Sequence, residues 1–207
     1  LTVSFRANAE RAAAFGGIAA LVQADLTNAA DRARLLDAAP ELYGLAVFAG
    51  DPARVKDPAQ MEALLAHSHA VNYEGPILLA RDAAARMRCN GTAGSIVLFS
   101  TMQAVGLFPG STVYAGAKAA LAHAARVLAK ECRGPANIRV NVIAPGTMDA
   151  GMARASIASG KYDHLLRDGS IPRYGQALDV ARAVRFFLEP DNYITGQVLS
   201  VDGGAAL

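Results

Sequence analysis

Short apolar runs recur along the chain, and segments with helical periodicity separate them. The run Ser95–Phe99 (S-I-V-L-F) is almost entirely apolar, and the runs at 45–48 and 138–143 are similar. A strand that is apolar on both faces has to be buried on both faces, as a central strand is in a parallel sheet covered by helices. The sequence therefore predicts an α/β fold with a doubly wound parallel sheet in three layers, α/β/α.

The rest of the chain alternates in the same way. We expect strands at 2–5, 19–23, 45–48, 95–99, 138–143 and 197–201, helices at 6–15, 29–39, 59–87, 113–132 and 178–188, and a mixed segment at 147–174. No repeat or low-complexity linker divides residues 1–207, so a single domain is expected. In such sheets functional groups gather at the carboxyl ends of the strands, near the point where the strand order reverses.

Composition and charge argue against several classes of protein. Hydrophobic residues make up 53% and charged residues 18%, which is typical of a folded globular chain. The net charge is +2 without a basic block, so no nucleic-acid partner is expected. No apolar run reaches ~18 residues, so no membrane span is expected. Cys89 and Cys132 fit neither a disulfide nor a metal pattern, which favours a cytoplasmic location. His67 and His69 do not share a helix face, so no metal site is expected.

The most informative polar motif begins where the run 95–99 ends. Ser100 and Thr101 follow that run, and Tyr114 and Lys118 stand four residues apart at the start of the next helix, on one face of it. A lysine ammonium beside a phenol favours the phenolate, so Lys118 is expected to lower the pKa of Tyr114. A tyrosine tuned in this way exchanges a proton near neutral pH. Taken alone, the Y-x-x-x-K spacing is more often a surface pair on an ordinary helix.

An ordered set of further motifs accompanies this pair. They are A-D-L-T (24–27), Ala49-Gly50, Asn72 in V-N-Y-E-G-P, N-V-I-A-P-G (141–146) and the tail Y-I-T-G-Q-V-L-S-V-D-G-G (193–204). With these motifs in this order, the whole chain resembles the short-chain dehydrogenase/reductase family, particularly its 3-oxoacyl-carrier-protein-reductase-like branch. The resemblance implies a Rossmann-like fold and an oxidoreductase that transfers hydride between NADP(H) and a ketone or secondary alcohol, with 3-oxoacyl reduction as one candidate.

The resemblance also assigns roles to four residues. Tyr114 would be the proton donor and acceptor for the carbonyl oxygen, and Lys118 would hold the cofactor ribose as well as lower the tyrosine pKa. The family serine stands thirteen residues before the tyrosine, which is the position of Thr101, with Ser100 one step earlier; either hydroxyl could hydrogen-bond the oxygen, and the position favours Thr101. Asn72 would hold a water in a proton relay to Lys118. The alternative for Asn72 is a residue at a helix irregularity, without a chemical role.

A cofactor site and a substrate pocket follow from the same resemblance. Arg6 stands where NADP enzymes of this fold carry an arginine and NAD enzymes an acidic residue, so NADP(H) is expected over NAD(H). A solvated arginine at a helix start is the alternative. The expected cofactor-binding residues are Arg6, Asp25, Leu26, Ala49, Gly50, Tyr114, Lys118, Pro145, Gly146 and Met148. The substrate, a small-molecule or acyl carbonyl compound, would contact Ser100, Met102, Gln103, Phe108 and the segment 148–174.

The chain departs from the family pattern in three places. No glycine-rich loop precedes Arg6, so the first strand and helix of the family, about 30 residues, are expected to be missing from this chain. The strands near Val3 and Leu21 should then be separated from the later ones. Phe48 replaces the asparagine of N-N-A-G, and Ala150 replaces a threonine. These two losses leave open a second hypothesis, a non-catalytic binding or scaffolding protein that binds the dinucleotide poorly.

Association between copies of the chain is expected as well. The predicted helices at 59–87 and 113–132 have alanine-rich faces, and proteins of the family pair these helices into four-helix contacts. The tail G-Q-V-L-S-V-D-G-G resembles the segment that forms a second two-fold contact in the family. A homotetramer is therefore the first expectation and a dimer the second.

Overall fold

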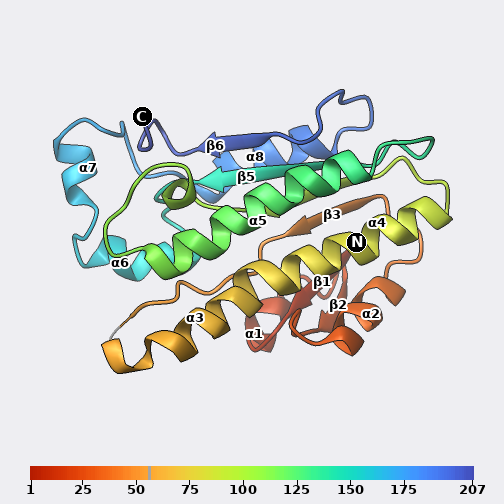
Figure 1. The fold of residues 1–207 in the computed structure, drawn as a ribbon, viewed down its shortest axis with the longest axis horizontal. Helices are drawn as coiled ribbons and strands as arrows, with labels where there is room; N and C mark the ends of the chain where they lie inside the picture. The colour runs from red at the N-terminus through yellow and green to blue at the C-terminus, as the bar shows by residue number, and fades with distance from the viewer. Residues whose placement is uncertain (56) are drawn as a thin grey trace.

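The computed structural model describes residues 1–55 and 57–207 and consists of parallel strands surrounded by helices (Figure 1). One parallel sheet has two strands and the other has four. The strands are β1 (Thr2–Phe5), β2 (Ala20–Gln23), β3 (Gly44–Val47), β4 (Ser95–Phe99), β5 (Arg139–Pro145) and β6 (Val198–Val201). Each predicted strand is confirmed, and its ends differ from the prediction by no more than two residues.

The two sheets are separate in the part of the chain that the structure describes. The orders are β1-β2 and β3-β4-β5-β6, and every pairing is parallel. In the larger sheet Val47 pairs with Leu98, and Leu98 pairs with Val142. This arrangement confirms the expected separation of the first two strands from the later ones.

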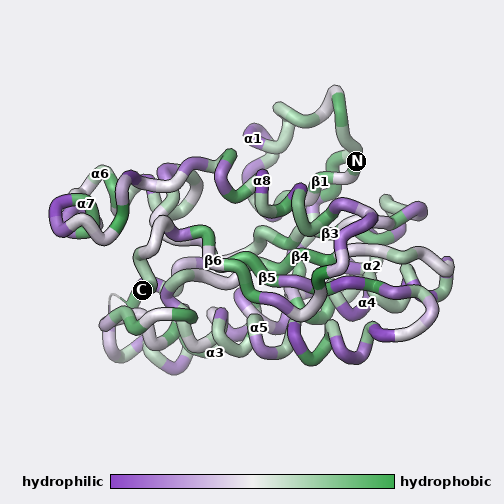
Figure 2. Tube along the Cα trace, turned by 90° about the horizontal axis from the view of Figure 1, so that it is seen from above, coloured by the Kyte–Doolittle hydropathy of each residue, from purple (hydrophilic) through white to green (hydrophobic). Residues whose placement is uncertain are grey.

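Helices cover both faces of the larger sheet, which confirms the predicted three layers. Figure 2 shows α3, α4 and α5 along one side of the sheet and α8 on the other. The helices are α1 (Ala9–Ala13), α2 (Ala29–Asp37), α3 (Met61–His69), α4 (Gly75–Cys89), α5 (Thr112–Glu131), α6 (Arg154–Ala158), α7 (Asp163–Arg167) and α8 (Ala177–Leu188). Among residues 1–55 and 57–207, none of the helices combines the length and the apolar character that crossing a membrane requires.

The core follows from the period-2 alternation of side chains along β4. Ile96 and Leu98 point to one face of the sheet and pack with residues of α4 and α5, whereas Val97 and Phe99 point to the other and pack with Phe187 of α8. Ile96, Val97 and Leu98 are 0% exposed. Burial of each such side chain contributes roughly 1.5–3 kcal/mol, which explains why the run is apolar at consecutive positions.

The predicted helix at 59–87 is a continuous helical run that changes type within its length. A 3₁₀ turn at Pro58–Gln60 leads into α3, a π-helical turn at Ala70–Glu74 follows, and α4 completes the run. Pro76, near the start of α4, cannot donate the backbone hydrogen bond that a regular α-helix would use there, which favours a local change of helix type. Asn72 lies inside the π turn and is fully buried, so the expected helix irregularity is present.

Candidate active site

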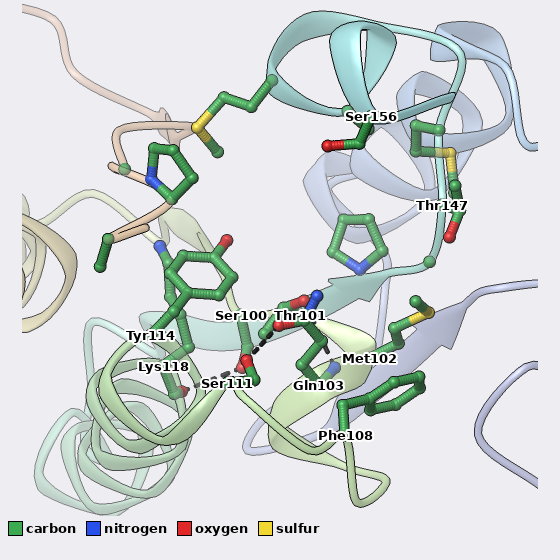
Figure 3. Close-up of a pocket in the computed structure, with 18 of the residues that line it drawn as sticks. Ser100, Thr101, Met102, Gln103, Phe108, Ser111, Tyr114, Lys118, Thr147 and Ser156 are labelled. Atoms are coloured by element: carbon green, nitrogen blue, oxygen red, sulfur yellow. Dashed lines mark hydrogen bonds between the residues drawn. The ribbon is translucent and has the colours of Figure 1, made fainter. Parts of the chain in front are cut away.

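The carboxyl ends of β3, β4 and β5 open onto a pocket of about 610 Å³ (Figure 3). Its walls come from the loops after these three strands, from the start of α5 and from the segment around α6 and α7. The four residues predicted singly to contact the substrate line it, namely Ser100, Met102, Gln103 and Phe108, and so does part of the predicted segment 148–174. Of the other predicted site residues, Ala49, Gly50, Thr101, Tyr114, Lys118, Pro145, Gly146 and Met148 line it too, whereas Arg6, Asp25, Leu26 and Asn72 do not.

Tyr114 lies in the first turn of α5, and its ring points into the pocket (Figure 3). Burial raises the pKa of Tyr114 from 10.0 to about 12, because the phenolate would lose water. A hydrogen bond with the Thr101 side chain acts in the opposite direction and lowers this pKa, while Tyr162 and Asp51 raise it by smaller amounts. The expected lowering of the tyrosine pKa by Lys118 is therefore wrong for this geometry, since desolvation dominates.

Lys118 lies one turn further along α5 and is 2% exposed. Its Nζ donates hydrogen bonds to the carbonyl oxygens of Phe99 at 2.8 Å and Ala49 at 3.3 Å. Burial lowers the pKa of Lys118 from 10.5 to about 8. The ammonium thus binds the chain after β3 and the end of β4. Its Nζ is directed toward these carbonyl oxygens, and Lys118 does not depress the pKa of Tyr114.

The two hydroxyls after β4 have different surroundings. The Ser100 hydroxyl donates to the carbonyl oxygen of Lys118 at 2.9 Å, so it links β4 to α5. The Thr101 hydroxyl interacts with Tyr114 and also accepts from the Gln103 backbone N–H at 3.4 Å. The structure therefore favours Thr101 over Ser100 as the hydroxyl beside the phenol, in agreement with its sequence position.

Asn72 anchors the loop that follows β3. Its Oδ1 accepts from the backbone N–H of Asp51 at 2.9 Å, and its Nδ2 donates to the Asp51 carbonyl oxygen at 2.9 Å and to Ser68 Oγ at 3.0 Å. Both side-chain N–H groups of Asn72 are thereby used. Gly50 passes so close that a Cβ there would lie 3.0 Å from Asn72 Oδ1 and 3.4 Å from Lys118 Nζ. The glycine permits this contact between the loop and both polar side chains.

A family model described as "Enoyl-(Acyl carrier protein) reductase" matches residues 2–206. The chain belongs to the short-chain dehydrogenase/reductase family. It is 34% identical, over 94% of its length and 80% of the relative, to an uncharacterized oxidoreductase of Methylorubrum extorquens. It is 38% identical to the 3-oxoacyl-[acyl-carrier-protein] reductase FabG of Chlamydia trachomatis, over 64% of this chain and 53% of that protein.

Further relatives differ in the activities that their names give. An NADPH-dependent aldehyde reductase-like protein of Arabidopsis thaliana is 32% identical over 67% of this chain and 51% of its own length. A solved short-chain type dehydrogenase/reductase of Mycobacterium ulcerans is 26% identical and has a TM-score of 0.89 over 99% of this chain and 80% of that one. A 7α-hydroxysteroid dehydrogenase solved with NADH is 29% identical, with a TM-score of 0.81 over 96% of this chain and 78% of that one.

Phe48 departs from the family pattern and has a defined place in the pocket. Its ring stacks on Phe99 with 4.3 Å between the centroids and an interplanar angle of 29°. It is 64% exposed and lines the pocket. An aromatic wall therefore replaces the amide that the family usually carries at this position.

Ser111 and Thr147 are among the pocket residues that were not predicted from the sequence. The Ser111 hydroxyl donates to Oε1 of Gln103 and so holds the glutamine against the start of α5. Thr147 is 5% exposed, and the described part of the chain gives its hydroxyl no hydrogen-bond partner. No spacing rule in the sequence marks either residue; only the position of Ser111 just before a helix draws attention to it.

Arg6, Asp25 and Leu26 lie at the carboxyl ends of the smaller sheet, outside the pocket. The Asp25 carboxylate accepts from Thr27 N and Oγ1 at 2.9 and 2.7 Å. These bonds lower the pKa of Asp25, and Arg6 adds a smaller effect in the same direction. Arg6 and Asp25 are thus near each other, as a shared site would require.

The residues present fit a nicotinamide dinucleotide. The pocket offers aromatic and thioether surface for flat rings, a buried lysine ammonium, and the hydroxyl of Thr147, which has no partner among the described residues. A separate cationic side chain, Arg6, stands exposed at the end of β1. Flat apolar surface with a few placed polar groups is what a cofactor site of this kind needs.

Proposed function

We propose that the protein is an NADP(H)-dependent oxidoreductase that interconverts a ketone and a secondary alcohol, with 3-oxoacyl groups among its candidate substrates. The observation that carries the proposal is the convergence of Tyr114, Thr101 and Lys118 on one pocket at the carboxyl ends of parallel strands. Relatives named as a 3-oxoacyl reductase and as an NADPH-dependent aldehyde reductase-like protein support it. Arg6, in a segment S-F-R-A-N without an acidic residue, supports NADP(H) over NAD(H).

When bound, the nicotinamide supplies the hydride in reduction and accepts it in oxidation. Tyr114 is neutral at physiological pH because its pKa is about 12, so its phenol holds the proton that the carbonyl oxygen takes up. The Thr101 hydroxyl beside it donates a second hydrogen bond as negative charge develops on that oxygen. Lys118, one turn away, holds the chain after β3 and the end of β4 beside the phenol through the carbonyl oxygens of Ala49 and Phe99, and its ammonium would hold the cofactor ribose.

The other predicted residues would hold the cofactor. Ala49, Gly50, Pro145, Gly146 and Met148 line the pocket and would bind its nicotinamide half, while Arg6, Asp25 and Leu26 would bind its adenosine half. Asn72 keeps the loop after β3 in place through its bonds to Asp51. The predicted role of Asn72 in a water relay would then involve its backbone carbonyl, because its side-chain amide is committed.

A fluorescence titration of the native polypeptide with NADPH, followed by a turnover assay, tests the proposal against the non-catalytic alternative. We expect saturable binding of NADPH and reduction of a ketone. Tyr114→Phe should lower turnover by about 10²–10⁴-fold, the usual contribution of a positioned proton donor, and leave NADPH binding unchanged. Tyr193→Phe is the matched control, since Tyr193 is fully exposed and lies outside the lining of this pocket.

Two results would contradict the proposal. The absence of saturable binding at millimolar NADPH would favour the non-catalytic binding or scaffolding protein. Turnover that Tyr114→Phe leaves unchanged would assign the proton transfer to another group.

We further propose a homotetramer, or else a dimer, in the cytoplasm. Leu65 of α3, Leu78 of α4 and Val127 of α5 expose 40–45% of their apolar surface, and Val198 and Leu199 expose 37% on β6. Apolar side chains left exposed on these elements support association through both surfaces. The exposed free thiol of Cys89 fits a reducing compartment.

A further inference from the structure

The pocket carries positive charge beyond that of Lys118. Arg54, from the loop after β3, and Lys161, from the turn between α6 and α7, both line it. None of the described residues that line the pocket is an aspartate or a glutamate. A concave site with cations and without acidic side chains attracts an anion.

Arg54 is held at the wall formed by α6. Its Nη2 donates to the Met152 carbonyl oxygen at 3.3 Å and to Ser156 Oγ at 3.2 Å. Figure 3 shows Ser156 across the pocket from Thr101, so this wall faces the proposed reacting groups. Within residues 1–55 and 57–207, Nε and Nη1 of Arg54 have no hydrogen-bond partner. The guanidinium is therefore positioned, yet most of its donors remain free for a ligand.

Lys161 is placed relative to Tyr114, the proposed proton donor, by Tyr162, which follows it in the sequence. Its Nζ is 5.5 Å from the centroid of the Tyr162 ring, and Tyr162 is near enough to Tyr114 to raise its pKa. The turn at 159–162 thus brings an ammonium toward the catalytic side of the pocket.

Neither cation forms an ion pair with a described carboxylate. Other arginines do: Arg86 pairs with Asp37 at 2.5 Å and Arg173 with Asp179 at 2.7 Å. Asp51 is an acidic residue that raises the pKa of Tyr114, and its Oδ1 already accepts from the Ala53 N–H at 2.8 Å. Among the described residues, Arg54 and Lys161 therefore lack a counter-charge, as does the buried Lys118, whose Nζ already donates to two carbonyl oxygens.

Between the cations and Thr101 the pocket is mainly apolar. Its lining includes Phe48, Phe99, Met102, Phe108, Met148 and Met152. We propose that the protein acts on a carbonyl compound with an apolar body and an anionic group, and that Arg54 and Lys161 determine this specificity by binding the anion. The inference rests on the proposed function for the carbonyl chemistry and adds the charge of the substrate. A guanidinium that presents free donors suits a carboxylate, and a phosphate has the same chemistry.

The test compares 4-acetylbenzoate with the neutral, nearly isosteric 4-acetylbenzamide, using the native polypeptide and NADPH. We expect the acid to be reduced with the higher kcat/KM. Arg54→Gln should lower that value about tenfold for the acid, because a hydrogen bond to a charged group is lost, and should leave the amide unchanged. Lys161→Gln should act likewise. Arg167→Gln is the matched control, since Arg167 lies on the neighbouring α7 outside the pocket lining.

A third substrate and a titration separate the possible sources of the anion. Acetoacetyl-CoA places its phosphates far from the ketone. If its kcat/KM exceeds that of 4-acetylbenzoate and Arg54→Gln removes the difference, the anion that Arg54 binds is a phosphate of the carrier. Equal kcat/KM for acid and amide in the wild type would overturn the inference. So would a weakened NADPH titration in Arg54→Gln, which would assign the cation to the cofactor.

The inference remains testable if no ketone is reduced and the proposed function fails. Thermal unfolding is then measured with 4-acetylbenzoate and with the amide. Stabilisation by the acid alone, absent in the Arg54→Gln/Lys161→Gln double variant, supports an anion site. An equal shift in the wild type and the double variant overturns it.

Discussion

The buried ammonium of Lys118 makes the stability of the protein depend on pH in a definite direction. Burial lowers the pKa of Lys118 from 10.5 to about 8, because the charge loses water and gains only the carbonyl oxygens of Phe99 and Ala49. Between these two pH values the unfolded chain binds more protons than the folded one, so the free energy of unfolding rises with pH. The change in pKa corresponds to about 3 kcal/mol over the whole window.

Replacement by Lys118→Met removes the titrating group and should remove this rise. Urea unfolding of wild type and variant, measured from about pH 7 to about pH 10 without cofactor, gives the difference in unfolding free energy. As the pH rises across this range, the free energy of unfolding of the wild type should increase by about 2–3 kcal/mol relative to that of the variant. Tyr114 makes the free energy of unfolding fall with pH, but only above pH 10.0. Its raised pKa of about 12 keeps the folded phenol protonated at pH values where the unfolded chain has already lost that proton.

Lys130→Met provides the control for this experiment. Lys130 is on the same helix as Lys118 but is exposed. Its replacement should leave the slope of stability against pH unchanged. If the curves of wild type and Lys118→Met run parallel from about pH 8, the pKa in the folded state, to the upper end of the measured range, the ammonium does not carry the desolvation cost assigned to it, and the reasoning fails.

Two further predictions concern the packing around the site. Asn72→Ala should lower the free energy of unfolding by about 2–4 kcal/mol, because it leaves the N–H and C=O of Asp51 without their partners; a loss below about 1 kcal/mol in denaturant unfolding would contradict this. Gly146→Ala should cost about 1–3 kcal/mol, since its Cβ would lie 2.6 Å from the Asp202 Cα. In contrast, Gly116→Ala, inside α5 with nothing within 4 Å of its Cβ, should stabilise by about 0.5–1 kcal/mol. If Gly146→Ala and Gly116→Ala changed the free energy of unfolding equally, the backbone at Asp202 would not restrict Gly146 as described.

The strands were predictable because their burial on two faces leaves a direct mark on the sequence. Ser95–Phe99 is apolar at consecutive positions since Ile96 and Val97 enter different core clusters, and the observed strand has the predicted ends. The separation of the smaller sheet was also predicted, from the strand order of the family and the absence of its first strand from this chain. The π-helical type of the turn at Ala70–Glu74 was not predicted, because no particular amino-acid composition distinguishes a π turn from an α-helix. The single-domain organisation stays a prediction.

The site was predictable in its members but not in their interactions. Tyr114 and Lys118 share a helix face as the spacing required, yet the long lysine side chain reaches two strand-end carbonyls and the phenol is governed by desolvation. Spacing gives the position of a Cβ and says nothing about the water around a side chain. Arg54 was not predicted at all, and Lys161 was predicted only as part of the segment 148–174, because both come from irregular segments, where no periodicity indicates which residues face a pocket.

The π turn at Ala70–Glu74 sets the rotation of α3 about its axis relative to α4. Each residue of an α-helix advances by about 100°, so one residue more or less in this turn would rotate α3 by that angle while both helices stay intact. Asn72, inside the π turn, is hydrogen-bonded to Ser68 of α3 and to Asp51 of the loop after β3, which forms part of the pocket wall. A change of one residue in length here would therefore spare the core on α4 and yet displace the loop after β3, which makes the turn a place where pocket shape can vary independently of the fold.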